Sequence, residues 1–340
     1  MRKIQINRDF YNLFFSHILF TMKAIKLYSV FSIFALVFLF ASCGADSFSA
    51  WQTDFDAVKQ AAQKDDKNIL VFFSTDDVQG VSKDLRENVF AKKKFVKSVS
   101  NSFELLNIDV TESEYTAWQS DESGEAKAAF QRKLDILDAY SVESMPAFYM
   151  LTKDGFVIKA FAYDPAINNV NHYLQLIEAE KENADSYNSL VRAVEESQGV
   201  YRVRAINALF DATDKEYNTL LLPYCREVAS LDPSDTTGLV GKFEFQVAYT
   251  DAIKLFHEGN VEDAAKCFVD AVLSGHLSKE QIQEAYYNAS YILAMSKTYD
   301  ERVLDYLKLS YESLPSGKEA ENVKRTIEAV EQMTKEREAQ

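Results

Sequence analysis

The pattern of apolar and polar positions predicts four strands in the first half of the chain. Residues 69–74 begin with five consecutive apolar side chains between polar neighbours, which is typical of a central strand covered on both faces. Residues 103–110, FELLNIDV, predict a second buried strand. Residues 147–151 and 156–161 predict a hairpin, because an Asp-Gly pair between them is a strong turn signal.

Helical spacing precedes the first of these strands. Trp51, Phe55, Val58 and Ala62 recur at intervals of 4, 3 and 4 residues, which places them on one helix face. Thr53 is the expected N-cap of this helix.

Further helices fill the gaps between the strands. We expect one from about Val81, one over residues 126–140, and a closing helix that Asp164-Pro165 opens. The polar, acidic stretch 115–125 is expected to be a surface excursion. The order helix, strand, helix, strand, helix, hairpin, helix predicts an α/β domain whose mixed sheet is flanked by helices.

The junction after the first strand carries a recognisable motif. Residues 73–82 read FSTDDVQGVS and resemble the F-x-x-x-D-W-C-x-x-C segment of bacterial members of the thioredoxin superfamily. In this alignment Val78 takes the tryptophan position, and Gln79 and Ser82 take the two cysteine positions. The resemblance implies the thioredoxin fold over about residues 50–180, without its redox pair.

A second segment supports the same resemblance. Residues 140–151, YSVESMPAFYML, are similar to the family's Y-x-V-x-x-x-P-T segment, with Ala147 in place of the usual threonine. The family's proline follows a cis peptide bond and borders the substrate-binding loop. The resemblance therefore implies a cis bond between Met145 and Pro146 and a binding loop there, beside the degenerate motif.

The residues at the motif do not supply the family's chemistry. A thiolate at the start of a helix is the nucleophile, and a second thiol resolves the mixed disulfide. Gln79 cannot act as a nucleophile, and Ser82 would need a base, although no histidine precedes His172 in this domain. Phe72 and Phe73 occupy the strand region where the family's buried carboxylate would lie. We expect no catalytic residues and no enzyme activity.

Two neighbouring carboxylates leave an alternative open. Asp76 and Asp77 could form an acid–base pair, but carboxylates in a turn before a helix more often cap it and carry solvated charge. We favour the capping interpretation.

The other potentially reactive residues, cysteines and histidines, are scattered along the sequence. Cys225 and Cys267 fall in helical segments and are interpreted as small buried residues, and a disulfide between them stays open. His172, His257 and His276 have no metal-ligand spacing. There is no glycine-rich phosphate loop, so we predict neither a cofactor nor a metal.

The second half of the chain predicts helices and short turns only. Residues 252–274 resemble the turn and second helix of a tetratricopeptide (TPR) repeat, and residues 282–315 resemble a weaker copy. Residues 322–335 are expected to form a capping helix. The resemblance implies an all-α helical-repeat (TPR-like) domain that binds protein segments, and the alternative is a plain helical bundle that braces the first domain. A tyrosine-rich run at residues 286–311 could line a groove, although core packing is more usual.

The N-terminal segment resembles an export signal. Residues 22–43 combine a charged start with an apolar stretch of about 14 residues, short of the ~20 needed to span a bilayer. The ending before Cys43 resembles a bacterial lipobox, with Phe40 where leucine is usual, and implies lipidation of Cys43. Ordinary cleavage and an uncleaved anchor are the alternatives. Residues 1–21 are interpreted as an extension upstream of the true start at Met22.

Charge limits the classes of partner. The net charge is −15, and because nucleic-acid binding depends on neutralising phosphates, an acidic chain argues against it. We expect four segments: the extension 1–21, the signal 22–43, a thioredoxin-like domain over 44–181, and a TPR-like domain over 182–340.

These expectations combine into one leading hypothesis. It is a redox-inactive, lipid-anchored protein of the bacterial envelope, periplasmic or surface facing, that binds protein or peptide partners. The alternative is a thiol–disulfide oxidoreductase or isomerase-like protein with an atypical site. A hydrolase-like use of Ser82 is a third possibility, for which nothing supplies a base.

Overall fold

The computed structural model describes residues 48–76, 80–120, 124–296 and 300–338. The predictions for the extension, the signal segment and Cys43, and those for Asp77, Val78 and Gln79, lie outside the described residues. Within the described part no helix is long and apolar enough to cross a membrane.

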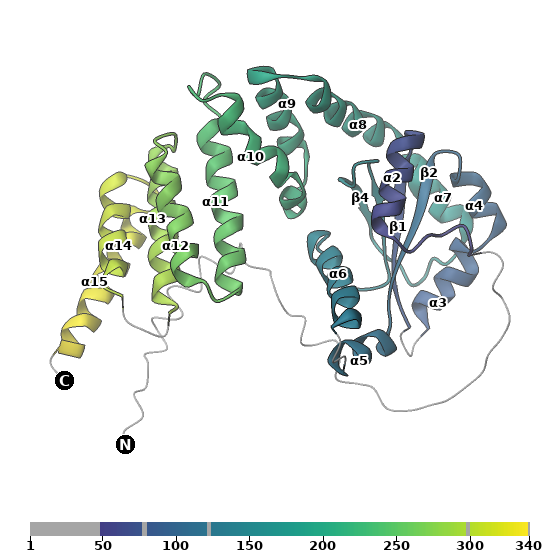
Figure 1. Ribbon diagram of the computed structural model, residues 1–340, viewed down its shortest axis with the longest axis horizontal. Helices are drawn as coiled ribbons and strands as arrows, with labels where there is room; N and C mark the ends of the chain where they lie inside the picture. The colour runs from purple at the N-terminus through teal and green to yellow at the C-terminus, as the bar shows by residue number, and fades with distance from the viewer. Residues whose placement is uncertain (1–47, 77–79, 121–123, 297–299, 339–340) are drawn as a thin grey trace.

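The first half of the chain is a mixed sheet with helices on both faces (Figure 1). Its strands are β1 (Asn68–Thr75), β2 (Phe103–Val110), β3 (Ala147–Leu151) and β4 (Val157–Phe161), in the spatial order β2-β1-β3-β4. β1 pairs in parallel with β2 and antiparallel with β3, and β3 pairs antiparallel with β4. All four predicted strands are confirmed.

Seven α-helices and one π-helical turn accompany the sheet in the described residues of this half. They are α2 (Phe55–Asp65), α3 (Val81–Leu85), η1 (Arg86–Phe90, the π-helical turn), α4 (Lys93–Val99), α5 (Glu112–Ser120), α6 (Glu125–Ala139), α7 (Val170–Ala179) and α8 (Lys181–Glu196).

The central strand β1 explains how the two faces are covered. Side chains alternate across a strand, so Ile69, Val71 and Phe73 point to one face while Leu70 and Phe72 point to the other, and all five are fully buried. The first face packs against α2 and α6. The second packs against α3, η1, α4 and α7. The continuous apolar run in the sequence is the consequence of this two-sided burial.

Three local predictions were wrong in detail. The N-cap of α2 is Asp54, not Thr53, and its carboxylate accepts the N–H of Ala57 at 2.9 Å. Residues 115–120 lie at the surface as expected, but they belong to α5, a helix that was not predicted, in which Tyr115 and Trp118 stack with 5.7 Å between ring centroids.

The third correction concerns the closing helix. It begins at Val170, because Asn169 is its cap and accepts the N–H of His172 at 3.0 Å. Asp164 instead closes a local turn by accepting the N–H of Ala166 at 2.8 Å.

The second half is an all-helical array that extends from the sheet domain (Figure 1). After α8 come α9 (Gly199–Ala212), η2 (Lys215–Leu221), α10 (Leu222–Leu231), α11 (Val240–His257), α12 (Val261–Leu273), α13 (Lys279–Ala294), α14 (Arg302–Ser313) and α15 (Ala320–Glu338). In the described residues of this half, the prediction of helices and turns only is confirmed.

The first helices of this array share a hydrophobic core with the sheet. One cluster of buried residues runs from Trp51 through the sheet to Val194, Val228 and Phe243. The rings of Tyr149 in β3 and Tyr217 in η2 meet edge to face, with centroids 6.3 Å apart. Helices α8 to α10 therefore brace the β-hairpin side of the first domain.

A separate cluster holds the last five helices together. It includes Ala264, Phe268 and Ala271, the small and large positions expected of a repeat helix, and all three are buried. Gly259 makes the turn between α11 and α12 with φ +83°, a value that favours glycine. Two successive helical hairpins and a final helix are thus present, and their membership in the tetratricopeptide class stays a prediction.

Candidate functional site

The degenerate motif lies where the first strand passes to helix α3. Of its two cysteine positions only Ser82 is described, in the first turn of α3, and its side chain is fully buried. Its Oγ accepts the backbone N–H of Thr75 at 3.1 Å. The hydroxyl therefore closes the strand–helix connection and does not face solvent.

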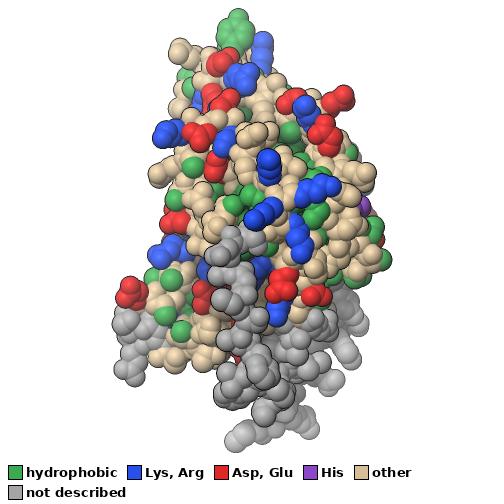
Figure 2. Space-filling model, turned by 90° about the vertical axis from the view of Figure 1, so that its right-hand side faces the viewer, with side chains coloured by type: hydrophobic (Ala, Val, Ile, Leu, Met, Phe, Trp, Pro, Cys, Tyr) green, Lys and Arg blue, Asp and Glu red, His purple; other side chains and the backbone are tan. Residues whose placement is uncertain are grey.

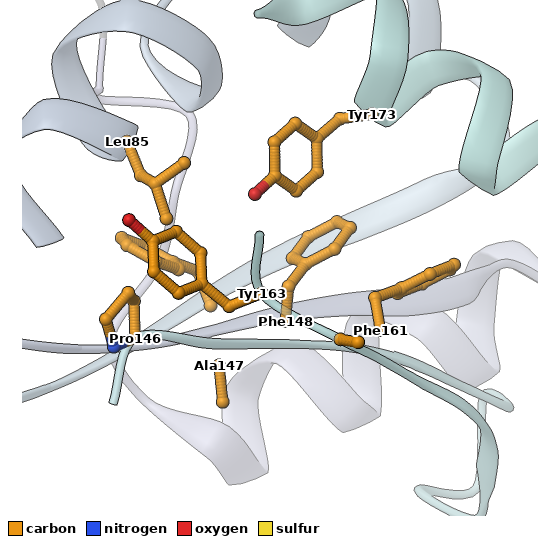
Figure 3. Close-up of a pocket in the computed structure, with 9 residues that line it drawn as sticks. Leu85, Pro146, Ala147, Phe148, Phe161, Tyr163 and Tyr173 are labelled. Atoms are coloured by element: carbon orange, nitrogen blue, oxygen red, sulfur yellow. The ribbon is translucent and has the colours of Figure 1, made fainter. Parts of the chain in front are cut away.

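The second predicted segment lies against the same helix. The Met145–Pro146 peptide bond is cis, as the resemblance implies. Pro146 and Leu85 of α3 line one shallow pocket, so two segments about sixty residues apart in sequence are neighbours in space (Figure 3).

This pocket is mostly apolar. It is lined by Phe72, Leu85, Pro146, Ala147, Phe148, Phe161, Ala162, Tyr163 and Tyr173. Tyr163 is 38% exposed, whereas Tyr173 is 4% exposed and its ring descends from α7 with the hydroxyl toward the pocket (Figure 3). Burial, and then the neighbouring Tyr163 and Asp164, raise the pKa of Tyr173 to about 12. Its hydroxyl therefore stays a protonated donor at physiological pH.

A polar cluster lies at the C-terminal end of β1 and was not predicted from the sequence. Ser74 and Asp109 are register partners on the parallel strands β1 and β2, and the Ser74 hydroxyl contacts the Asp109 carboxylate. Arg86 donates from Nη2 to Asp109 Oδ1 at 3.0 Å and to Ser74 Oγ at 3.2 Å. Asn107 Oδ1 lies 3.0 Å from the same hydroxyl.

This cluster bears on whether the domain has a buried carboxylate like the one that the thioredoxin family places on this strand. Phe72 and Phe73 fill their strand positions with apolar rings, as expected. A carboxylate does approach the site, but from the neighbouring strand and already paired with Arg86. The Asp109 carboxylate is therefore already occupied by partners within the protein, the guanidinium of Arg86 and the hydroxyl of Ser74. The only sequence signal was an aspartate near the end of a strand parallel to β1.

Asp76 has a structural role. Its Oδ1 accepts the backbone N–H of Glu112 at 3.0 Å. It thus supports the first turn of α5, where a carboxylate also complements the helix dipole. The capping interpretation holds for Asp76, although the helix is α5 and not α3.

The remaining thiols are apart from this site. Cys225 in α10 and Cys267 in α12 are both free, so the disulfide that the sequence left open is not formed. Burial raises the pKa of Cys225 to about 12, and burial together with Asp251, Asp270 and Asp263 raises the pKa of Cys267. No group of three potential metal ligands occurs among the described residues.

Two families match separate parts of the chain. A family described as "Thioredoxin-like domain" matches residues 55–177, and one described as "Uncharacterised protein C-terminal domain" matches residues 239–337. A similar relative is an uncharacterised protein of Treponema pallidum (strain Nichols), 22% identical over 276 residues that cover 81% of this chain and 87% of the relative.

A solved structure titled "DsbH Oxidoreductase" also resembles part of the chain. It is 11% identical and has a TM-score of 0.33, over 43% of this chain and 95% of that structure. A likeness at this level carries no argument about activity.

Proposed function

Residues 55–177 form a thioredoxin-like domain, and from this premise we propose that the protein is a non-catalytic, membrane-tethered binding module of the bacterial envelope. The strongest support for this proposal comes from the residue at the second cysteine position. Where the family places its second redox cysteine, the chain has Ser82, whose hydroxyl is buried and bonded to the N–H of Thr75.

The chemistry around Ser82 supports the absence of catalysis. A serine nucleophile needs an adjacent base within hydrogen-bond reach. The hydrogen bond found for Ser82 Oγ comes from a backbone N–H, which cannot accept a proton. The neighbouring carboxylate of Asp109 is engaged by Arg86 and Ser74.

The pocket beside Pro146 supports a binding role. A shallow apolar surface with a protonated hydroxyl at its side suits contact with an extended segment that lies across it, beside Tyr163 and Tyr173. Extended peptides commonly combine main-chain hydrogen bonds with side-chain pockets. The helical array over residues 182–340 would add a protein-interaction platform.

The tether follows from the sequence before the described residues. Residues 22–43 resemble a lipoprotein signal, and lipidation of Cys43 would hold the protein at a membrane face. We propose an envelope location, periplasmic or surface facing, with protein or peptide partners and no cofactor.

A reductase assay tests the catalytic half of the proposal. The chain from Ala45 keeps every residue of the three hydrophobic clusters and can be produced without the anchor. It should reduce insulin no faster than the background rate. Turnover that disappears in Ser82→Ala would instead establish the atypical oxidoreductase.

Two further experiments test binding and tethering. Capture of envelope proteins by the intact chain should weaken in Tyr163→Ala, which changes an exposed wall of the pocket, while Tyr201→Ala, an exposed tyrosine on α9, should not. Radiolabelled palmitate should enter the intact chain and not Cys43→Ser. Equal labelling of both chains would remove the lipid anchor from the proposal.

A further inference from the structure

Helix α4 carries a cluster of basic side chains in an otherwise acidic protein. Lys92, Lys93, Lys94 and Lys97 are all exposed, and we refer to these four as the lysine face. Figure 2 looks at the side of the molecule that holds α3 and α4 and shows lysine and arginine side chains gathered there. The opposite side of α4 is apolar, since Phe95 is fully buried in the core of the domain.

The lysine face is not neutralised by the protein itself. None of its four ammonium groups forms an ion pair among the described residues, and Lys94 donates to the uncharged Asn171 at 2.5 Å. Residues 83–97 hold six Lys or Arg against two Asp or Glu, while the whole chain carries −15. Leaving like charges together without partners costs free energy, so an anionic partner from outside would relieve it.

The start of the described chain lies against the same helix. Phe48 stacks on Trp51 with ring centroids 5.4 Å apart, and Trp51 stacks on Phe95 of α4 at 6.3 Å. The guanidinium of Arg86 lies over the Phe48 ring at 5.4 Å. The chain therefore enters the domain directly beneath α4.

This entry point limits how far the lysine face can be from the tether. Four residues lie between Cys43 and Phe48, and the five Cα–Cα steps that join the two span at most about 18 Å. A lipid on Cys43 would thus keep α4 close to the bilayer, and charge attraction acts where its lysines come within about 8–10 Å of the surface.

We propose that the lysine face docks on anionic phospholipid headgroups of the membrane that holds the anchor. The inference rests on the tether described under the proposed function and adds an orientation to it. Lysine suits this role because each ammonium is a point charge on a flexible stem and needs no fixed partner geometry. Basic residues near an anionic leaflet are attracted to it, whereas the acidic remainder of the protein is repelled and points away.

Vesicle flotation of the chain from Ala45, which lacks Cys43, tests the docking without any lipid anchor. Binding to phosphatidylcholine vesicles that contain phosphatidylglycerol should exceed binding to pure phosphatidylcholine. It should vanish as salt rises from about 0.01 M to about 1 M, because the screening length shrinks from about 30 Å to about 3 Å. The triple variant K92Q/K93Q/K97Q should lower the partition coefficient on the order of 100-fold, about 5-fold for each lysine.

A matched control carries the same charge change elsewhere. Lys254, Lys279 and Lys324 are exposed on α11, α13 and α15, which lie in the helical array away from α4 (Figure 1). The variant K254Q/K279Q/K324Q should bind within about 2-fold of the parent chain, because charge attraction to the membrane is short-ranged and these lysines are not on the docking face. Thermal unfolding of both triple variants verifies that each is folded.

Equal losses in the two triple variants, or no preference for phosphatidylglycerol, would overturn the proposal. Palmitate labelling of Cys43 is independent of this assay, so failure of the docking and failure of the tether are told apart.

Discussion

The hydroxyl of Ser82 and the backbone N–H of Thr75 form a 3.1 Å hydrogen bond that joins the end of β1 to the first turn of α3. This bond occupies the only polar group of a fully buried side chain. Ser82 is therefore part of the scaffold that joins β1 to α3, and its contribution should be measurable as stability.

We predict that Ser82→Ala lowers the free energy of unfolding by about 1–3 kcal/mol, because the N–H of Thr75 would lose its partner in a partly buried place. Ser82→Cys should cost less, since a thiol fills the site and accepts weakly. Urea denaturation of the three chains measures the order. Unchanged stability in Ser82→Ala would show that water replaces the hydroxyl.

Cysteines placed at positions 79 and 82 should give the domain thiol–disulfide exchange activity. The helix start and the cis Met145–Pro146 bond are retained, and a helix N-terminus lowers the pKa of a thiol placed there. We predict that the double variant Gln79→Cys/Ser82→Cys reduces insulin with dithiothreitol, whereas each single variant does not. A double variant without activity would indicate that the surrounding site, including Arg86 and Asp109, is also incompatible with thiol exchange.

The Arg86–Asp109 pair is expected to stabilise the site more than a surface pair does. Both side chains are about two-thirds buried, at 32% and 27% exposure, and they share the Ser74 hydroxyl. Asp109→Asn should cost about 1–3 kcal/mol, because the guanidinium of Arg86 loses its counter-charge.

A comparison pair lies one helical turn away. Lys83 and Glu87 approach only to 3.9 Å and are 70% and 60% exposed, so Glu87→Gln should change stability by less than about 0.5 kcal/mol. Chemical denaturation of both variants at neutral pH checks the contrast. Equal costs for Asp109→Asn and Glu87→Gln would mean that solvent screens the pair at Arg86 as well.

The sheet and the position of Ser82 were predictable because apolar runs such as residues 69–73 have few ways to be buried. The Arg86–Asp109 pair was not, since Arg86 lies in η1 and Asp109 in β2, and only the tertiary fold brings the two together. The predicted N-cap was Thr53, whereas the observed N-cap is Asp54. Threonine and aspartate both cap helices well, so the choice between them depends on the residue at which the helical backbone begins.

The α5 helix was missed for a related reason. Its apolar stripe consists of Tyr115 and Trp118 alone, too short to show helical period in an acidic stretch. Both rings are only partly buried, and they pack against Phe130, which α6 brings to them from outside the segment. The formation of helix α5 therefore depends on tertiary contacts, which a local sequence pattern does not reveal.

The pH dependence of stability should include a contribution from Glu114. Burial alone would raise its pKa, but hydrogen bonds from Lys133 and Thr111 outweigh that and hold the pKa of Glu114 below its usual value. A lowered folded-state pKa gives stability that is present above the unfolded value near 4.5 and is lost as pH falls through the folded value.

Glu114→Gln should therefore be less stable than the parent at pH 7, by no more than about 1 kcal/mol because solvent screens the pair with Lys133. The two chains should converge at acid pH below both pKa values. Urea midpoints at neutral and acid pH measure the difference. A gap that persists at acid pH would show that packing, and not charge, is responsible.

The two free thiols should differ sharply in reactivity. Cys225 is 2% exposed and its pKa is raised to about 12, so at pH 8 only about one molecule in 10⁴ carries its thiolate, the reactive form. Cys267 is half-buried and accessible in part. In the chain from Ala45, Ellman's reagent should therefore titrate one thiol in the folded state and two in denaturant. Cys267→Ser should abolish the native reaction, and Cys225→Ser should leave its rate unchanged. Loss of the native reaction in Cys225→Ser would mean that α10 opens on the timescale of the assay, and with it the core that the array shares with the sheet.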